Sequence, residues 1–387
     1  MTTVTNEKQA GDLLARLVAC PSVNPARVPP AGPPFGEGPL VDLLADLVGG
    51  WGAETQKVEV APGRFNLIAR FPGTGPRSLM LEAHADTVAV SDMTIEPFTP
   101  AIRDGKLFGR GSCDDKGPMA AMLLAIRSAL ASGQRPRATL YFVSTCDEEL
   151  GSFGAHHLMA GALRPDAAVV GEPTDMAIVH AHKGAYRFRL TTHGRAAHSS
   201  NPSMGSSAIT PMAAIVQALD AGLAPAMKAQ AHPLLGPPTV SIGTIRGGTQ
   251  VNVVPARCEI EVDCRVLPGE TSAGVAAQVR ALVDGILKAD ARLSYSLDDL
   301  EWYPAFEQDL ASPIVATTRA ACQKVLGAAQ MAAVPWASNA GVFHAAGIPC
   351  VLFGPGSIKQ AHTADEHIAL AEVVRAAEVY AEIIRRF

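Results

Sequence analysis

Apolar segments with the spacing of β-strands alternate with segments that have the spacing of helices along most of this chain. The expected strands of the larger part are 54–60, 66–71, 78–83, 139–144, 167–170 and 348–353. The expected helices are 10–19, 38–48, 118–131, one from Pro313 to Gly327, and a last one that ends at Arg386. This alternation predicts an α/β fold, in which a sheet carries helices on its faces. Such sheets place their chemistry in loops at the carboxyl ends of the strands.

The middle of the chain has a different pattern, in which apolar and polar residues alternate one by one. Within 257–266 the apolar residues fall on one face of the expected strand, and Glu259, Glu261, Asp263 and Arg265 fall on the other. Strand patterns near 186–190, 239–245 and 292–297 and helical patterns at 205–219 and 272–288 complete the order βαββαβ, which is typical of a split βαβ module. We therefore expect 180–297 to be a small domain inserted into a larger one made of 1–179 and 298–387.

The composition excludes several classes of protein. Of the 387 residues, 48% are hydrophobic and 18% are charged, which argues against a disordered chain. The formal net charge is −5 and no cluster of Lys and Arg stands out, so neither nucleic acid nor a membrane is expected as a partner. A long uncharged stretch that includes 331–358 contains internal prolines and several glycines, which excludes a plain membrane-spanning helix.

The cysteines and the first residues bear on the compartment. Seven cysteines, an odd number without any C-x-x-C pair, do not resemble a disulfide framework or a structural zinc knuckle. The first ten residues are polar and no apolar segment follows them directly, so a signal peptide is not expected. These features predict a cytoplasmic protein.

Acidic and histidine residues stand where several apolar strand patterns end. They are His84 and Asp86 after 78–83, Asp147, Glu148 and Glu149 after 139–144, Glu172 after 167–170, and His362 after 348–353. Asp114 lies in a glycine-rich segment, 109–117, that leads into a helical pattern. Because clustered carboxylates repel one another unless cations neutralise them, a mixed set of His, Asp and Glu indicates a divalent metal site. Imidazole ligands favour zinc over magnesium.

Five short motifs carry a resemblance to a known family. They are His84-Ala-Asp86-Thr-Val, Gly109-Arg-Gly-Ser-Cys-Asp114-Asp-Lys-Gly117, Asp147-Glu148-Glu149, Gly171-Glu172-Pro-Thr and Ala361-His362. In this order they resemble the co-catalytic zinc deacylases and exopeptidases, the family of acetylornithine deacetylase, succinyl-diaminopimelate desuccinylase, aminoacylase and glutamate-releasing carboxypeptidases. The resemblance covers essentially the whole chain. It implies a mixed-sheet catalytic domain of the dizinc exopeptidase type, with 180–297 as a ferredoxin-like lid that forms a homodimer contact.

The resemblance also implies the ligands of two divalent metal ions, for which zinc is expected and cobalt is a substitute. Asp114 would bridge the two ions. His84 and Glu172 would complete one site, and Glu149 and His362 would complete the other. Clustered carboxylates and imidazoles of this kind suit such a pair of cations.

Two further acids have implied roles beside the metals. Asp86 would fix the tautomer of the His84 imidazole by a hydrogen bond, without binding metal. Glu148 would be the general base that acts on a metal-held water, and it would later pass the proton to the leaving amine. Adjacent positions point their side chains in different directions, so Glu148 and Glu149 suit different tasks.

The lid and one late turn supply the expected substrate contacts. His198, in the segment 194–202, resembles the family histidine that reaches the neighbouring subunit's site and stabilises the tetrahedral oxyanion. The segments that contain Asn252 and Arg265 resemble those that hold substrate, and Arg265 suits a two-pronged hydrogen bond to a carboxylate. The turn 354–357, which includes Gly356, is expected to offer backbone N–H groups to that carboxylate. Asn339 stands where members of the family often carry Asp, which leaves the choice of substrate open.

These features predict a zinc-dependent amidohydrolase that removes an N-acyl group, with acetyl favoured, from an amino acid such as N-acetylornithine. The implied chemistry is attack of metal-bound water on the amide carbonyl. A succinyl-diaminopimelate desuccinylase, or a carboxypeptidase or dipeptidase that takes a short peptide, stays open as an alternative. A non-catalytic binding relative is disfavoured because Glu148 and Asp114 are both present. Dehydrogenases, nucleotide-binding proteins and serine hydrolases are excluded because their glycine-rich and G-x-S-x-G motifs are missing.

Overall fold

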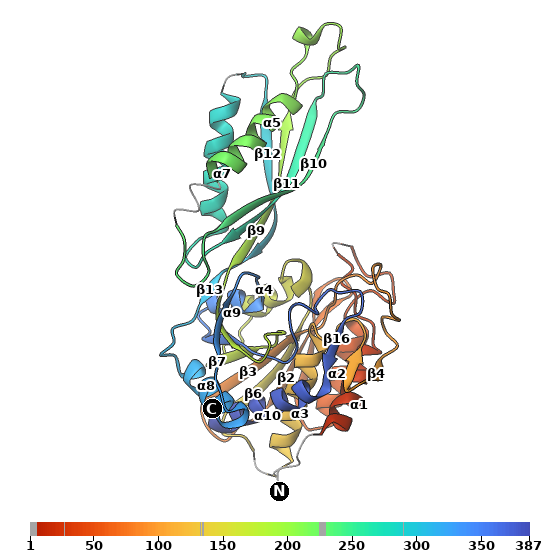
Figure 1. The fold of residues 1–387 in the computed structure, drawn as a ribbon, viewed down its shortest axis with the longest axis vertical. Helices are drawn as coiled ribbons and strands as arrows, with labels where there is room; N and C mark the ends of the chain where they lie inside the picture. Colours follow the sequence, from red (N-terminus) through yellow and green to blue (C-terminus); the bar gives the residue numbers. More distant parts are fainter. Residues whose placement is uncertain (1–5, 27, 132, 134, 224–229, 289) are drawn as a thin grey trace. The chain divides into compact units, whose positions relative to one another are not determined.

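The computed structural model describes residues 6–26, 28–131, 133, 135–223, 230–288 and 290–387, and it divides into two compact units (Figure 1). Unit 1 comprises Met1–His180, Gln308–Ala332 and Ser338–Phe387. Unit 2 comprises Ala181–Glu307 and Ala333–Ala337. The expected inserted segment, 180–297, begins one residue earlier and ends ten residues sooner. The difference at the end arises because β12 (Ser294–Tyr303) continues well beyond the strand expected at 292–297.

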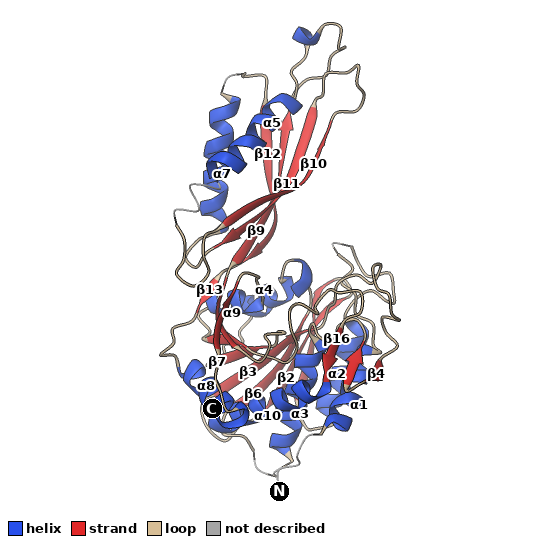
Figure 2. Cartoon of the chain, viewed as in Figure 1, coloured by secondary structure: helices blue, strands red, loops and turns tan. Residues whose placement is uncertain are grey.

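A mixed sheet forms the centre of unit 1, as predicted (Figure 2). Its strand order is β1 (Glu54–Ala61), β2 (Arg64–Phe71), β6 (Thr139–Thr145), β3 (Ser78–His84), β7 (Ala167–Val170), β15 (Cys350–Leu352) and β8 (Ile178–His182). The pairs β6–β3, β3–β7 and β7–β15 are parallel, and β1–β2, β2–β6 and β15–β8 are antiparallel. The parallel strands β3 and β7 are buried on both faces, which explains why apolar residues follow one another directly at Leu79–Leu81 and Ala167–Val170.

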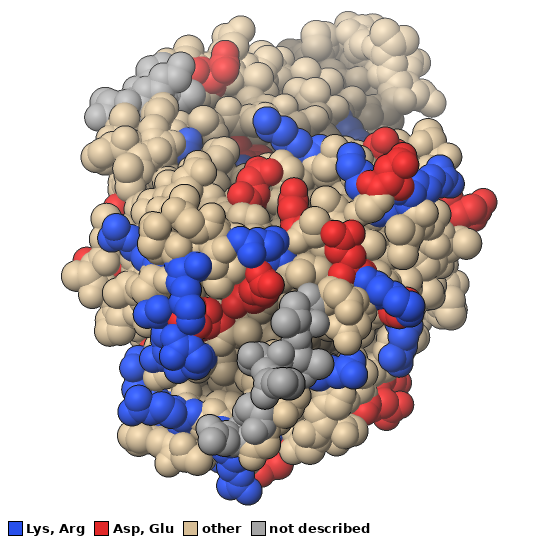
Figure 3. Space-filling view, turned by 60° about the horizontal axis from the view of Figure 1, so that its bottom comes forward, with Lys and Arg blue, Asp and Glu red and all other residues tan. Residues whose placement is uncertain are grey.

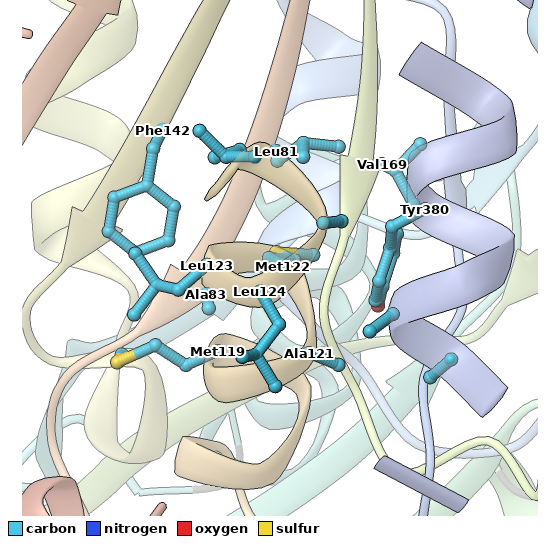
Figure 4. Close-up of a cluster of buried hydrophobic side chains, with 14 of the residues drawn as sticks. Leu81, Ala83, Met119, Ala121, Met122, Leu123, Leu124, Phe142, Val169 and Tyr380 are labelled. Atoms are coloured by element: carbon cyan, nitrogen blue, oxygen red, sulfur yellow. The ribbon is translucent and has the colours of Figure 1, made fainter. Parts of the chain in front are cut away.

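Helices cover this sheet. Their bounds are α1 (Glu7–Val18), α2 (Gly38–Gly49), α3 (Lys116–Leu130), α4 (Phe153–Ala160), α8 (Pro313–Leu326), α9 (Asn339–Ala345) and α10 (Leu370–Arg386). The helix α3 packs against α1, α10 and the sheet, so it is apolar on nearly every side. Figure 4 shows its Met119, Met122 and Leu123 among side chains of β3, β6, β7 and α10. As predicted, α8 has Ser312 at its N-cap and Gly327 after its last turn, with a left-handed φ of 80°.

The described residues also form several short elements. The strands β16 (His367–Ala369), β5 (Lys106–Phe108) and β4 (Ala101–Arg103) form a small sheet, and single turns lie at η1 (Glu148–Leu150) and η2 (Pro202–Met204). Two further strands are β13 (Phe306–Glu307) and β14 (Met331–Val334). Within the described ranges, none of the helices has both the length and the apolar character that crossing a membrane requires. Basic and acidic side chains are intermixed on the face shown in Figure 3.

Unit 2 has the predicted order βαββαβ, made of β9 (Gly184–His193), α5 (Ile209–Ala218), β10 (Thr239–Gly247), β11 (Arg257–Val266), α7 (Ser272–Leu287) and β12. A π-helical turn, η3 (Leu219–Leu223), follows α5. The strands are antiparallel in the spatial order β10-β11-β9-β12, the arrangement of a ferredoxin-like module. Tyr186, Phe188, Ile260 and Cys264 pack with α5 and α7 on one face. The helix α5 begins four residues later than expected, at Ile209.

Glu382, near the end of α10, is held by three cations. Its carboxylate accepts hydrogen bonds from Lys324 Nζ at 2.9 Å, Arg385 Nε at 2.8 Å and Arg386 Nε at 2.6 Å. The bonds from Arg385 above all lower the pKa of Glu382 to about 2. The folded pKa thus lies below the unfolded one, so this contribution to stability is present above about pH 4.5 and is lost as the pH falls toward 2.

We expect Glu382→Gln to lower the free energy of unfolding by only about 1 kcal/mol at pH 7, because the three cations are partly exposed and solvent screens their attraction to Glu382. The difference from wild type should shrink as the pH falls below about 4.5. Urea unfolding at several pH values measures both effects. The control is Glu378→Gln, which removes a single partner, Arg375, and should change stability less. Equal stability of Glu382→Gln and wild type at pH 7 would contradict the expectation.

Candidate metal centre

The predicted ligands lie at one edge of the sheet of unit 1, where parallel neighbours β6, β3, β7 and β15 end. His84 is the last residue of β3, and Glu149 lies in the turn after β6. Glu172 follows β7 by two residues, and His362 lies in the loop after β15. Asp114 lies just before α3. The strand order therefore brings together groups that are as much as 278 positions apart in sequence, from His84 to His362.

The Asp114 carboxylate lies between two imidazole rings. Its Oδ1 is 3.0 Å from Nε2 of His84, and its Oδ2 is 3.4 Å from Nε2 of His362. The Nε2 atom of His362 is also 3.0 Å from Oε2 of Glu149. Each carboxylate oxygen of Asp114 thus faces a different histidine nitrogen, which is the placement that a bridging ligand of two cations needs.

Two groups of side chains have ligand atoms close enough to share a cation. One is His84, Asp114 and Glu149, and the other is His84, Glu148 and Glu172; within each group all ligand atoms lie within 4.8 Å of one another. All five predicted ligands are therefore brought together in this part of the structure. Glu148, which the sequence resemblance assigns to the base, therefore also has a carboxylate oxygen within 4.8 Å of ligand atoms of His84 and Glu172.

The electrostatics of the cluster fit divalent cations. Burial, reinforced by the neighbouring carboxylates, raises the pKa of Glu148, Glu149 and Glu172 above the usual range. Hydrogen bonds to Asp114 and Glu149 raise the pKa of His362 to about 10. The cluster thus contains several buried carboxylates and two imidazoles that could carry a balancing positive charge. Because such a set is costly unless positive charge balances it, the donors present suit two bound divalent ions.

His84 has its nitrogens oriented for a ligand role. Its Nδ1 donates to the backbone carbonyl of Asp86 at 2.9 Å, which leaves Nε2 without a proton in the neutral ring. The carboxylate of Asp86 is farther away, at 3.6 Å from Nδ1. That carboxylate instead accepts the backbone N–H groups of Glu148 at 3.0 Å and Glu149 at 3.1 Å. Asp86 thus orients His84 mainly through its carbonyl, and its side chain holds the turn after β6.

Asn339 lies in a buried hydrogen-bond network with Glu82 and Thr145, next to the ends of β3 and β6. Its amide donates to Oε1 of Glu82 and to Oγ1 of Thr145, both at 2.9 Å. Glu82 lies in β3 two residues before His84, and burial raises its pKa to about 7. Asn339 therefore links side chains at the ends of β3 and β6.

The residues that were predicted to bind substrate belong to both units: His198, Asn252 and Arg265 to unit 2, and Gly356 to unit 1. Within unit 2, the His198 and Asn252 segments lie side by side, because Ser199 N–H donates to Asn252 O at 3.0 Å. Arg265, on β11, donates to Asp263 at 2.8 Å. In unit 1, the N–H of Gly356 already donates to Oε2 of Glu372 at 2.9 Å. A substrate carboxylate at this N–H would have to take the place of Glu372, so this contact stays a prediction.

Glu366 organises the site in a way that the sequence motifs did not reveal. It is 0% exposed, and its Oε1 accepts the N–H groups of Cys113 at 2.9 Å and Asp114 at 3.0 Å. Its Oε2 accepts Gly111 N–H at 2.9 Å and Arg110 Nη1 at 2.7 Å. Backbone N–H groups leave no signature in a sequence, so only the proximity of Glu366 to His362 hinted at this role. This carboxylate shapes the loop that presents Asp114.

We expect Glu366→Gln to weaken metal binding by about 10- to 100-fold, since an amide places a donor against the N–H donors of this loop. Competition with a zinc-chelating dye measures the affinity. Glu372→Gln is the matched control, because Glu372 is exposed and accepts the Gly356 N–H, outside that loop; it should bind zinc as wild type does. Unchanged zinc affinity in Glu366→Gln would show that the Asp114 loop holds its shape without this carboxylate.

Comparisons with known proteins address the family. A family model described as peptidase family M20/M25/M40 matches residues 80–386. An acetylornithine deacetylase of Proteus mirabilis (strain HI4320) is 32% identical over 391 aligned positions, which cover 97% of this chain and 96% of the relative. An acetylornithine deacetylase of Erwinia tasmaniensis is 32% identical over 361 positions, which cover 89% of this chain and 91% of the relative.

Solved structures show the same fold. Aminopeptidase PepT from Bacillus cereus ATCC 10987 gives a TM-score of 0.76 at 24% identity and covers 99% of both chains. The M20 family metallo-carboxypeptidase Sso-CP2 from Sulfolobus solfataricus gives 0.77 at 18% identity, with 98% of this chain and 99% of that chain covered. The sequence match over most of the chain and the ligand cluster at the sheet edge lead to one conclusion: this chain is a hydrolase that belongs to peptidase family M20/M25/M40.

Proposed function

We propose that this protein is a dizinc amidohydrolase that removes an N-acyl group, acetyl in preference, from an amino acid such as N-acetylornithine. The observation that carries the proposal is the Asp114 carboxylate between the Nε2 atoms of His84 and His362, with Glu148 beside them. The similarity to relatives named acetylornithine deacetylase supports the choice of acyl group and amino acid.

The cluster would hold two zinc ions, which cobalt would replace. His84 and Glu172 would bind one ion, Glu149 and His362 the other, and Asp114 both. When bound, the two ions polarise the amide carbonyl and lower the pKa of a water molecule toward neutrality. The surrounding carboxylates set the charge at the site, and the buried Glu366 keeps Asp114 in place.

Glu148 would move the proton. Burial raises the pKa of its carboxylate above the usual range, which strengthens this group as a proton acceptor. In the forward reaction the Glu148 carboxylate takes a proton from the attacking water. It then gives this proton to the nitrogen of the leaving amino acid as the C–N bond breaks.

Residues of unit 2 would bind the substrate and stabilise the oxyanion. The Nδ1 atom of His198 accepts the N–H of Ser200 at 3.2 Å, so in the neutral ring the proton lies on Nε2. This Nε2–H suits a donor to the developing oxyanion. Asn252 and Arg265 would hold the amino acid, with the guanidinium of Arg265 exchanging Asp263 for the substrate carboxylate.

We further propose a homodimer through unit 2. Since the structure contains seven free thiols, we also propose a cytoplasmic location.

A release assay tests the proposed reaction. Purified protein with added zinc or cobalt is incubated with N-acetyl, N-succinyl and N-formyl amino acids and with dipeptides, and the free amine is measured. The proposal expects turnover of N-acetyl amino acids, with N-acetylornithine among the best. Selective release from N-succinyl-diaminopimelate would identify a desuccinylase, and selective cleavage of dipeptides would identify a peptidase. No release from any of these would contradict the proposal.

A separate experiment tests whether His198 acts in the site of the neighbouring subunit. We expect His198→Ala to lower turnover by about 100-fold while metal content stays unchanged. If His198 acts in the partner's site, mixing His198→Ala with a Glu148 variant should partly restore activity, because one site per heterodimer is then intact. Absence of recovery in heterodimers shown to form by mass spectrometry would count against a cross-subunit donor.

A further inference from the structure

A buried ion pair lies beside the candidate site, outside every motif of the family. Arg64, the first residue of β2, donates from Nε to Oε2 of Glu37 at 2.6 Å, and its Nη2 bonds the other carboxylate oxygen. Glu37 is the residue before α2 and is 0% exposed, and Arg64 is 3% exposed. Burying such a pair contributes little net stability, so its stabilising effect alone does not account for it.

The Arg64 guanidinium contacts both ends of the turn that carries Glu148. Its Nη2 lies 3.3 Å from Oδ1 of Asp147, directly before Glu148. The guanidinium also lies over the ring of Phe153, the first residue of α4, at 5.1 Å from the centroid. At the two ends of this turn, Asp147 and Ser152 adopt left-handed φ angles of 65° and 56°. Non-glycine residues keep such conformations where surrounding contacts hold them.

A short chain of hydrogen bonds continues from Arg64 to the backbone of Glu148. The Oδ1 atom of Asp147 also accepts Nδ2 of Asn24 at 3.0 Å, and the same Nδ2 donates to Oδ2 of Asp86 at 2.7 Å. Asn24 is oriented by the N–H of Ala26, which donates to its Oδ1 at 2.9 Å. Asp86 in turn accepts the Glu148 N–H at 3.0 Å. The turn is thus held through the Asp147 side chain and through its own backbone.

We propose that Arg64 is a positioning residue, which acts through Asp147 and Asn24 to fix the direction in which Glu148 points. This inference rests on the proposed function of Glu148 as the base. Arg64 itself touches neither the predicted metal ligands nor the substrate segments in any contact described above. Its removal should therefore change the rate of the proton-transfer step and leave metal binding and substrate affinity nearly unchanged.

The double variant Arg64→Met with Glu37→Met tests the proposal. It removes both charges of the Arg64–Glu37 pair, and the buried Asp147 carboxylate keeps the hydrogen bond from Asn24, so the variant should still fold. We expect kcat, measured at saturating zinc, to fall by about tenfold or more, with KM changed by less than about threefold and two zinc ions retained. The control removes a pair farther along the same strand, Arg70→Met with Glu54→Met, which is exposed and should keep full activity.

Two single variants cover the case in which the double variant fails to fold. Asn24→Ala leaves the buried pair intact and should lower kcat several-fold, and Arg64→Lys should give an intermediate kcat because it keeps the charge but not the fork of donors. A folded double variant or Asn24→Ala with wild-type kcat would overturn the positioning role. So would a low kcat that excess zinc restores, since the pair would then serve metal retention. Lack of activity in wild type on the whole substrate panel would instead refute the proposed function.

Discussion

Replacing Glu148 by alanine should lower turnover by about a thousandfold while the protein still binds two zinc ions. The reason is that the variant keeps all five predicted ligands, His84, Asp114, Glu149, Glu172 and His362, but has no group to accept the proton of the attacking water. Turnover of the best N-acyl amino acid and zinc content by atomic absorption, measured on the same preparation, give both quantities.

The neighbouring acid provides the matched control. Glu149→Ala should lose one zinc ion as well as turnover, since Glu149 contacts His362 at 3.0 Å in the ligand cluster. The contrast is informative because the Glu148 carboxylate also lies within 4.8 Å of ligand atoms of His84 and Glu172. If Glu148→Ala bound only one zinc ion, Glu148 would be a ligand and the base would have to be sought elsewhere. Residual turnover within about tenfold of wild type would likewise remove it from the base role.

Replacing Asp114 by asparagine should have a comparable effect on turnover, with a different cause. The carboxylate faces His84 with one oxygen and His362 with the other, so a single substitution affects both proposed ions. An amide offers one oxygen ligand and one NH₂ group, whose hydrogens carry partial positive charge and repel a cation. We expect zinc stoichiometry to fall from two to below one, and turnover to fall by about a thousandfold or more.

Isothermal titration with zinc measures the stoichiometry of the Asp114 variant. Asp104→Asn is the matched control, because Asp104 lies in an exposed turn between β4 and β5 and tolerates asparagine at its left-handed φ of 49°. It should bind zinc and turn over substrate as wild type does. Two zinc ions bound to Asp114→Asn with unchanged affinity would contradict the bridging role.

Much of the fold could be predicted because burial imposes simple periods on the sequence. The expected strands 167–170 and 257–266 have the same bounds as β7 and β11, the first because it is buried on both faces and the second because its faces alternate. Strands of three residues, such as β4, β5 and β16, contain too few positions to show a period. The strand at 292–297 was predicted too short because β12 carries acids at Asp298, Asp299 and Glu301 on a half-exposed sheet.

The candidate site was likewise predicted from the sequence only in part. The ligand types and their places after strands were readable in the sequence, because polar groups that interrupt apolar strands at one sheet edge require a compensating partner. Asp86 was predicted to fix the tautomer of His84 by a hydrogen bond. In the structure its backbone carbonyl accepts that bond, and its carboxylate accepts the N–H groups of Glu148 and Glu149. The turn at Gly356 was predicted to offer an N–H that Glu372 already accepts.

The sequence by itself determined the alternating α/β order, the βαββαβ segment and the set of histidines and acids, because these depend on residue type and local period. Only the tertiary structure decided which carboxylates hold the ligand loops. Glu366 bonds the N–H of Asp114, 252 residues earlier, and Arg64 reaches Asp147, 83 residues later. Such bonds join backbone groups or isolated side chains that packing brings together, and no local pattern in the sequence encodes their distance.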